Sequence, residues 1–97
     1  MKASTVARAA RYVAVTFPEA RDVAVSNLTM NSPAGEEDNV VVTVFIGQGD
    51  HLHVFASDDG SIAVGRDRTE TTIAMASRAP SKRVSFVPAA LVDEVVA

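Results

Sequence analysis

The chain contains no cysteine, which excludes disulfide bonds, thiolate nucleophiles and zinc sites built on thiolates. Long hydrophobic runs are also missing. Apolar runs such as Val40–Val42 and Val44–Ile46 are far shorter than the roughly 20 residues that a membrane-spanning helix needs. No short apolar segment follows a basic start, as it would in a secretory signal peptide. We therefore expect a cytoplasmic protein that does not enter a membrane.

Large aliphatic and aromatic side chains are scarce. Of the 97 residues, 16 are alanine and 16 are valine, whereas leucine and isoleucine together contribute six. Each buried methylene is worth about 0.8 kcal/mol, so a core of alanine and valine stabilises a monomer only modestly. A chain of this length forms one core. We expect a single domain, residues 1–97, that gains further burial as a homodimer.

Apolar residues at helical spacing predict a first helix over Ser4–Phe17. Ser4 or Thr5 is expected to cap its start, and Pro18 to end it, because the proline ring restricts the preceding residue to extended geometry. The inward face holds Val6, Ala9, Ala10, Val13 and Phe17. The opposite face is a mixed cationic and apolar surface that no core requirement explains. We interpret it as a candidate contact patch made of Arg8, Arg11, Tyr12 and Val15.

Alternating apolar residues predict a strand over Asp22–Met30, but the pattern changes parity along it. Val23 and Val25 share one face, whereas Leu28 and Met30 share the other. A one-residue shift in register moves a side chain to the opposite face of a sheet. Either a bulge interrupts the strand, or its two halves face different neighbours.

The strongest strand pattern covers Asn39–Ile46, which is apolar on both faces and therefore needs cover on each side. Short turns connect it to strands over His51–Ala56 and Ser61–Val64, which predicts an antiparallel meander. The preceding segment, Asn31–Asn39, has the composition of a loop. Three consecutive acids in that segment form a candidate acidic recognition tip: Glu36, Glu37 and Asp38.

Residues 66–80 favour a strand because several of them are branched at Cβ, although Ala74–Ala76 tolerates a helix. Arg83–Val87 predicts another strand, and Pro88 suits the first turn of a terminal helix. The apolar stripe of that helix is Leu91, Val92, Val95 and Val96. The expected fold is α+β: an N-terminal helix packed on an antiparallel meander sheet of about five or six strands, followed by a short C-terminal helix.

If residues 66–80 are helical instead, the order of elements resembles that of small acidic secretion chaperones. A helix followed by a meander is also similar to peptidase-propeptide-like and cystatin-like domains. These likenesses concern element order alone, so they imply a fold class and not a function.

No motif in the chain predicts catalysis or a cofactor. His51 and His53 share a strand face, but a metal site needs a third ligand that the sequence does not identify. Asp58 and Asp59 do not follow the spacing of a calcium-binding loop and fit a solvated turn. No serine lies in a nucleophile elbow, and Gly47–Gly49 lacks the other residues of a phosphate-binding loop. We expect no enzyme activity, no metal and no cofactor.

Nine basic and twelve acidic residues give a net charge of −3, which repels a phosphate backbone. Few aromatic side chains are placed to stack on bases. Basic residues still gather in three places along the chain: Arg8/Arg11, Arg66/Arg68 and Arg78/Lys82/Arg83. If these converge on one face, a small ligand- or nucleic-acid-binding domain is the alternative function.

The lack of chemical motifs and the doubly apolar strand favour a small acidic, non-catalytic protein–protein interaction module. We expect it to be homodimeric and to bind, inhibit or escort a partner protein. Phage-encoded inhibitors and chaperone-like adaptors share this size and charge, and the excess of arginine over lysine is typical of a GC-rich bacterial or phage genome. A small enzyme is the third hypothesis. The candidate binding residues are Arg8, Arg11, Tyr12, Glu36, Glu37, Asp38, Val92 and Val96.

Overall fold

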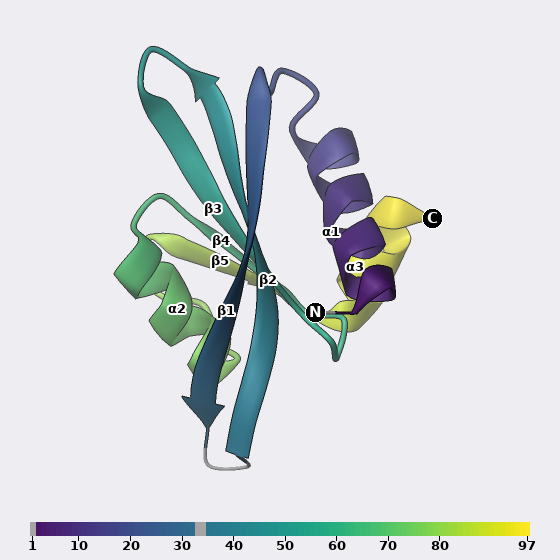
Figure 1. The fold of residues 1–97 in the computed structure, drawn as a ribbon, viewed down its shortest axis with the longest axis vertical. Coiled ribbons are helices and arrows are strands. Elements are labelled where there is room, and N and C mark those ends of the chain that lie inside the picture. The colour runs from purple at the N-terminus through teal and green to yellow at the C-terminus, as the bar shows by residue number, and fades with distance from the viewer. Residues whose placement is uncertain (1, 33–34) are drawn as a thin grey trace.

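The computed structural model describes residues 2–32 and 35–97. The elements are, in order, α1 (Ala3–Thr16), β1 (Asp22–Ser32), β2 (Gly35–Gly47), β3 (Asp50–Ser57), β4 (Ile62–Gly65), α2 (Arg68–Ser77), β5 (Val84–Val87) and α3 (Ala89–Val96). The five strands form one antiparallel sheet in the order β1-β2-β3-β4-β5 (Figure 1). The expected α+β class, with a helix before and after a meander, is confirmed. None of the helices in the described residues has the length and hydrophobicity to cross a membrane.

Helices cover both faces of the sheet. In Figure 1, α1 and α3 lie together on one face and α2 lies on the other. α1 packs over β2 and β3, whereas α2 packs over β3, β4 and β5. The core under α1 and α3 consists of Ala9, Tyr12, Val13, Val40, Val42, Val44, Val54, Ala56, Ile62 and Val92. The core under α2 consists of Met30, Val41, Phe55, Ala63, Ala74, Met75 and Val84.

From Asn39 to Val44, β2 is largely buried on both faces, as the sequence predicts, whereas Phe45, which the same pattern placed on a covered face, is 39% exposed. Val40, Val42 and Val44 pack under α1 and α3, while Val41 packs under α2. All four side chains are almost completely buried by this chain alone. The covering layers are therefore the protein's own helices, which removes one of the reasons for expecting a second chain to cover this strand.

β1 pairs with β2 in an unbroken antiparallel register along its whole length, from Asp22 opposite Phe45 onward. The change of parity in its sequence is therefore not a bulge, because its two halves face different layers. Val23 and Val25 face the α1 side and are 45% and 52% exposed, whereas Met30 is buried under α2.

Residues 68–77 form α2, so the preference for a strand in this region is wrong and the helical alternative is correct. The Asp67 carboxylate caps the helix by accepting a hydrogen bond from the Glu70 amide. Thr71 and Thr72 donate their hydroxyls to backbone carbonyls four residues earlier, which accommodates β-branched residues in a helix. Tertiary packing completes the helix, because Thr71, Ala74 and Met75 are buried against the sheet.

Two further local expectations are corrected. α1 begins at Ala3 after Lys2 and has no side-chain cap, because the Thr5 hydroxyl donates instead to Asp58 in the β3–β4 turn. The expected loop over residues 31–39 is mostly strand, because β1 ends at Ser32 and β2 begins at Gly35. Residues 33–34 lie outside the described residues. Cross-strand pairing over the full hairpin overrides the loop-like composition.

Candidate functional site

The cationic face of α1 is occupied by contacts within the chain. Arg8 pairs with Asp93 of α3 at 2.5 Å. Its guanidinium also donates to the carbonyls of Gly60 and Ala89, each at 3.2 Å. This arginine therefore joins α1, α3 and the β3–β4 turn.

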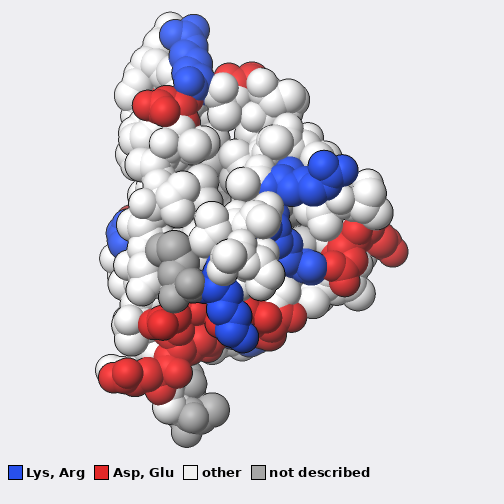
Figure 2. Space-filling model, turned by 45° about the vertical axis from the view of Figure 1, so that its right-hand side comes forward, with Lys and Arg blue, Asp and Glu red and all other residues white. Residues whose placement is uncertain are grey.

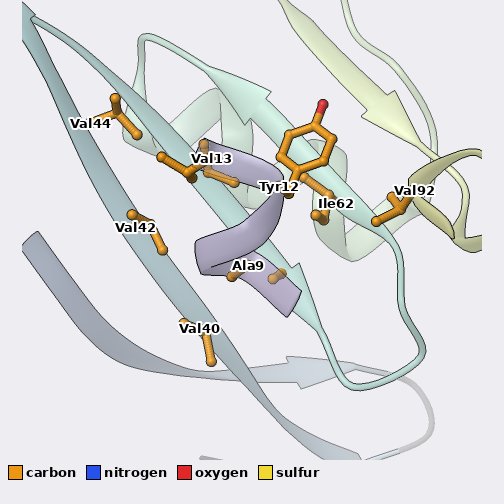
Figure 3. Close-up of a cluster of buried hydrophobic side chains, with 10 residues drawn as sticks. Ala9, Tyr12, Val13, Val40, Val42, Val44, Ile62 and Val92 are labelled. Atoms are coloured by element: carbon orange, nitrogen blue, oxygen red, sulfur yellow. The ribbon is translucent and has the colours of Figure 1, made fainter. Parts of the chain in front are cut away.

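Tyr12 belongs to the core and not to an outer contact patch. Its side chain is only 6% exposed, and Figure 3 shows its ring beside Ile62 and Val92. Helical spacing predicted Tyr12 on the outer face, because a helix that packs against a sheet alone has one buried face. The presence of α3 beside α1 gives the helix a second buried face.

The C-terminal helix also uses its candidate residues internally. Val92 is fully buried, and Val96 is partly buried against the same core. Arg11 of α1 donates to the Val96 carbonyl at 2.5 Å. The exposed half of the predicted apolar stripe is Leu91 and Val95.

The three acids at the start of β2 do not form a free tip. Glu37 is half-buried and pairs with Arg78 at the end of α2. Asp38 accepts a hydrogen bond from Thr29 across the β1–β2 hairpin at 2.8 Å. Glu36 is exposed.

Arg78 is the centre of a polar cluster that fastens α2 to the sheet. It contacts Glu37, donates to Asp59 at 3.0 Å, and donates to the Ser57 hydroxyl at 3.0 Å. Its backbone adopts the left-handed conformation that ends the helix, with φ of 53°. Burial alone raises the pKa of Asp59, but hydrogen bonds from Ser61 and Arg78 outweigh it and hold that pKa below its ordinary value. Each group in the cluster has a hydrogen-bond or ion-pair partner within it, so the cluster is suited to holding α2 against the sheet.

The two histidines lie on one strand face, as predicted, with ring centroids 5.1 Å apart. Phe45 lies beside His51, and the Thr43 hydroxyl lies 3.3 Å from a ring nitrogen of His53. Burial lowers the pKa of His53, and the neighbouring charges of His51 and Arg68 lower it further. Across residues 2–32 and 35–97, three or more metal-ligating side chains never gather closely enough to hold an ion.

The arginine clusters do not converge on a basic stripe, since most of their members bind acids of the same chain. Arg66 pairs with Asp50 at 2.6 Å, and Arg83 pairs with Glu70 at 2.5 Å. Arg8 and Arg78 make the internal ion pairs described above. In Figure 2, blue and red side chains accordingly lie next to each other in several separate groups.

An apolar groove of about 380 Å³ lies between α1 and β1. One wall is formed by Ala10 and Ala14 of α1 and by Phe17, which follows the helix, and Val23 and Val25 of β1 line the opposite side. Among the described residues, no charged side chain lines it. Figure 2, which turns the α1 and α3 side forward, shows a broad uncharged area between the charged groups at the top and bottom. The groove exists because α1 packs over β2 and β3 and leaves the start of β1 uncovered.

Sequence reasoning missed this groove although its residues are visible in the pattern. Ala10 and Phe17 were assigned to the inward face of the first helix, and Val23 and Val25 to one face of the first strand. The missing information was which strands α1 lies over, because the periodicity of a helix shows which of its faces is buried but not where on the sheet it packs. The small size of Ala10 and Ala14 was the available signal, because alanine cannot reach across to fill the space above β1.

Comparison of the chain with family models, with curated proteins and with solved structures found no match in any of the three.

Proposed function

We propose that this protein is a non-catalytic protein-interaction module that binds an apolar segment of a partner protein in the α1–β1 groove. The supporting observation is the exposure of Val23 and Val25 beside an uncharged groove wall. Exposed contiguous apolar surface on a small protein marks interaction sites. The chain leaves this surface open, while its own helices bury the central valines of β2 on both faces.

The remaining polar groups support the same conclusion. A catalytic group needs a free reactive atom near a pocket, whereas Asp59, Ser57 and Arg78 bind one another and lie away from the groove. The ligand- or nucleic-acid-binding alternative is less favoured because Arg8, Arg66, Arg78 and Arg83 bind acids or carbonyls of the chain.

A photo-cross-linking residue at Ala14, on the groove wall, tests this proposal directly. Ala76 on α2 is the matched control, because it is also an exposed alanine on a helix but faces away from the groove. In the native host cell, we expect the probe at Ala14 to capture a partner through an apolar segment and the probe at Ala76 not to capture it.

A peptide of the captured segment then provides the quantitative test. We expect Ala14→Asp to weaken its binding by roughly tenfold or more, because a buried carboxylate without a partner loses its hydration. Ala76→Asp should leave the affinity unchanged. Equal effects of the two substitutions contradict the proposal, and a gel shift with DNA or RNA at low salt that is lost when Arg68 and Lys82 become alanine supports the alternative.

A further inference from the structure

The two edges of the sheet are built differently. β5 is short, with four residues, is preceded by Lys82 and Arg83, and is followed by Pro88. Short length, flanking lysine and proline are devices by which proteins prevent another strand from pairing with an edge. This edge is therefore protected.

β1, at the other edge, has none of these devices. It is 11 residues long and contains no lysine, arginine, proline or glycine, and its register with β2 is free of bulges. Its backbone pairs with β2 on one side, and no strand of the described residues pairs with its other side. A long, unprotected edge presents a row of unpaired backbone donors and acceptors, which selects an extended strand as its partner.

We propose that this partner is the β1 strand of a second copy of the chain, paired antiparallel across a two-fold axis, so that two sheets join into one sheet of ten strands. This inference rests on the proposed function, because it completes the groove in which the partner protein is bound. β1 itself can serve as an added strand, because it contains no proline that would interrupt the new ladder of backbone hydrogen bonds and is already extended over its whole length.

The charge pattern of β1 suits pairing with an identical strand. Asp22, its first residue, is its only charged residue. In an antiparallel pair of identical strands, Asp22 faces its own copy only if the overlap is centred on that residue. Every longer overlap opposes Asp22 to an uncharged residue and brings no like charges together.

The same symmetry extends the groove. A two-fold axis perpendicular to the sheet keeps the α1 faces of both copies on the same side. With the axis beside Ala24, Val23 of each copy stands opposite Val25 of the other, and these four side chains form one continuous apolar floor between the two α1 helices. Because α1 stands over β2 and β3, the space above the paired β1 strands stays open for the partner segment.

Sedimentation of three proteins tests the pairing. We expect a dimer for the unmodified chain and for Ile73→Lys, and a dissociation constant raised by roughly tenfold or more for Val25→Lys. Ile73 is the matched control because it is also an exposed apolar residue, at 60%, but lies on α2. An unmodified chain that stays monomeric at high micromolar concentration overturns the proposal, as does equal dissociation of the two variants.

Single cysteines provide a second test that does not depend on weakening the dimer, since the chain has no cysteine of its own. The variants replace one residue at a time among Val23, Ala24, Val25, Ser26, Asn27, Leu28 and Thr29. In an antiparallel symmetric pair, the distance between identical residues grows by about 7 Å for each step away from the axis. A disulfide forms only when the two Cα atoms are within about 7 Å.

We therefore expect oxidation to link copies at the one position beside the axis and to fail two residues further along. A cysteine at Ser85 of β5 serves as the control edge. Uniform linking along β1, or linking equal to that at Ser85, contradicts the proposal.

The outcomes separate this inference from the proposed function. If the chain is monomeric but the probe at Ala14 still captures a partner, the second copy is refuted and the interaction module remains. If the chain is a dimer but the probe captures no partner, the pairing of two β1 strands remains and the interaction module is refuted. A one-to-one complex in which the foreign segment itself pairs with β1 also refutes the second copy.

Discussion

Substitution of Gly65 by alanine tests the close packing of α2 against the sheet. A methyl group at Gly65 of β4 would stand 2.5 Å from the Thr71 hydroxyl oxygen and 2.9 Å from a Val84 methyl carbon. Neither neighbour can move freely, because Thr71 is fully buried and its hydroxyl donates to the Asp67 carbonyl at 2.7 Å, while Val84 is held in the sheet. Overpacking of this kind costs about 2 kcal/mol.

The expected result is a free energy of unfolding lower by about 2 kcal/mol and a melting temperature lower by about 10 °C. Urea unfolding followed by circular dichroism measures it, at a fixed protein concentration because a dimer makes stability concentration-dependent. Thr71→Ala removes the nearest atom. The double variant should therefore lose at least about 1 kcal/mol less than the sum of the single losses. Strict additivity, or a loss within about 0.5 kcal/mol of zero for Gly65→Ala, refutes the packing of α2 described above.

Four further substitutions test the contacts that hold the helices in place, each by urea unfolding. Asp67→Ala removes the cap of α2 and should cost about 1 kcal/mol; no loss would mean that the cap is not formed. Arg8→Met should cost about 1 to 3 kcal/mol, because it leaves the Gly60 and Ala89 carbonyls without their donor. Asp93→Asn removes only an exposed ion pair and should cost less than about 1 kcal/mol. Equal losses from Arg8→Met and Asp93→Asn would contradict the role of the two carbonyl contacts in joining α1 to α3 and the β3–β4 turn. Asp59→Asn should lower stability at neutral pH. The pKa of Asp59 is lower in the folded state than its ordinary value of 3.8, so its contribution is complete above that pH and is lost as the pH falls through the lower folded-state pKa. A difference from the unmodified chain that persists unchanged at pH 2 would refute this linkage.

The strand pattern of the sequence predicted the meander because alternation and turn residues report burial directly. Asn39–Ile46 is apolar at both parities, and from Asn39 to Val44 it is largely buried on both faces. The reversal of parity between Val25 and Leu28 predicted either a bulge or two different neighbours for the halves of β1, and the unbroken register with β2 selects the second. These features depend only on which face of a single strand is buried, and the alternation of apolar and polar residues along that strand indicates this directly.

The errors arose where a distant element decides the outcome. Residues 68–77 carry β-branched side chains, but the Asp67 cap and burial of Ala74 and Met75 make them helical. Tyr12 became buried because α3, from the other end of the chain, packs beside α1. Glu37 was predicted to be a free acid, but it meets Arg78, which is 41 residues away in sequence. Local periodicity contains no information on such pairings.

Amide hydrogen exchange along β1 is the most direct test of the claim that its edge is the association surface. In the unmodified chain, alternate amides of β1 point away from β2. At high micromolar concentration, we expect these outward amides to be protected from exchange, and at low micromolar concentration to exchange rapidly, while the amides of β5 behave alike at both. Rapid exchange of the outward β1 amides at both concentrations would contradict the claim.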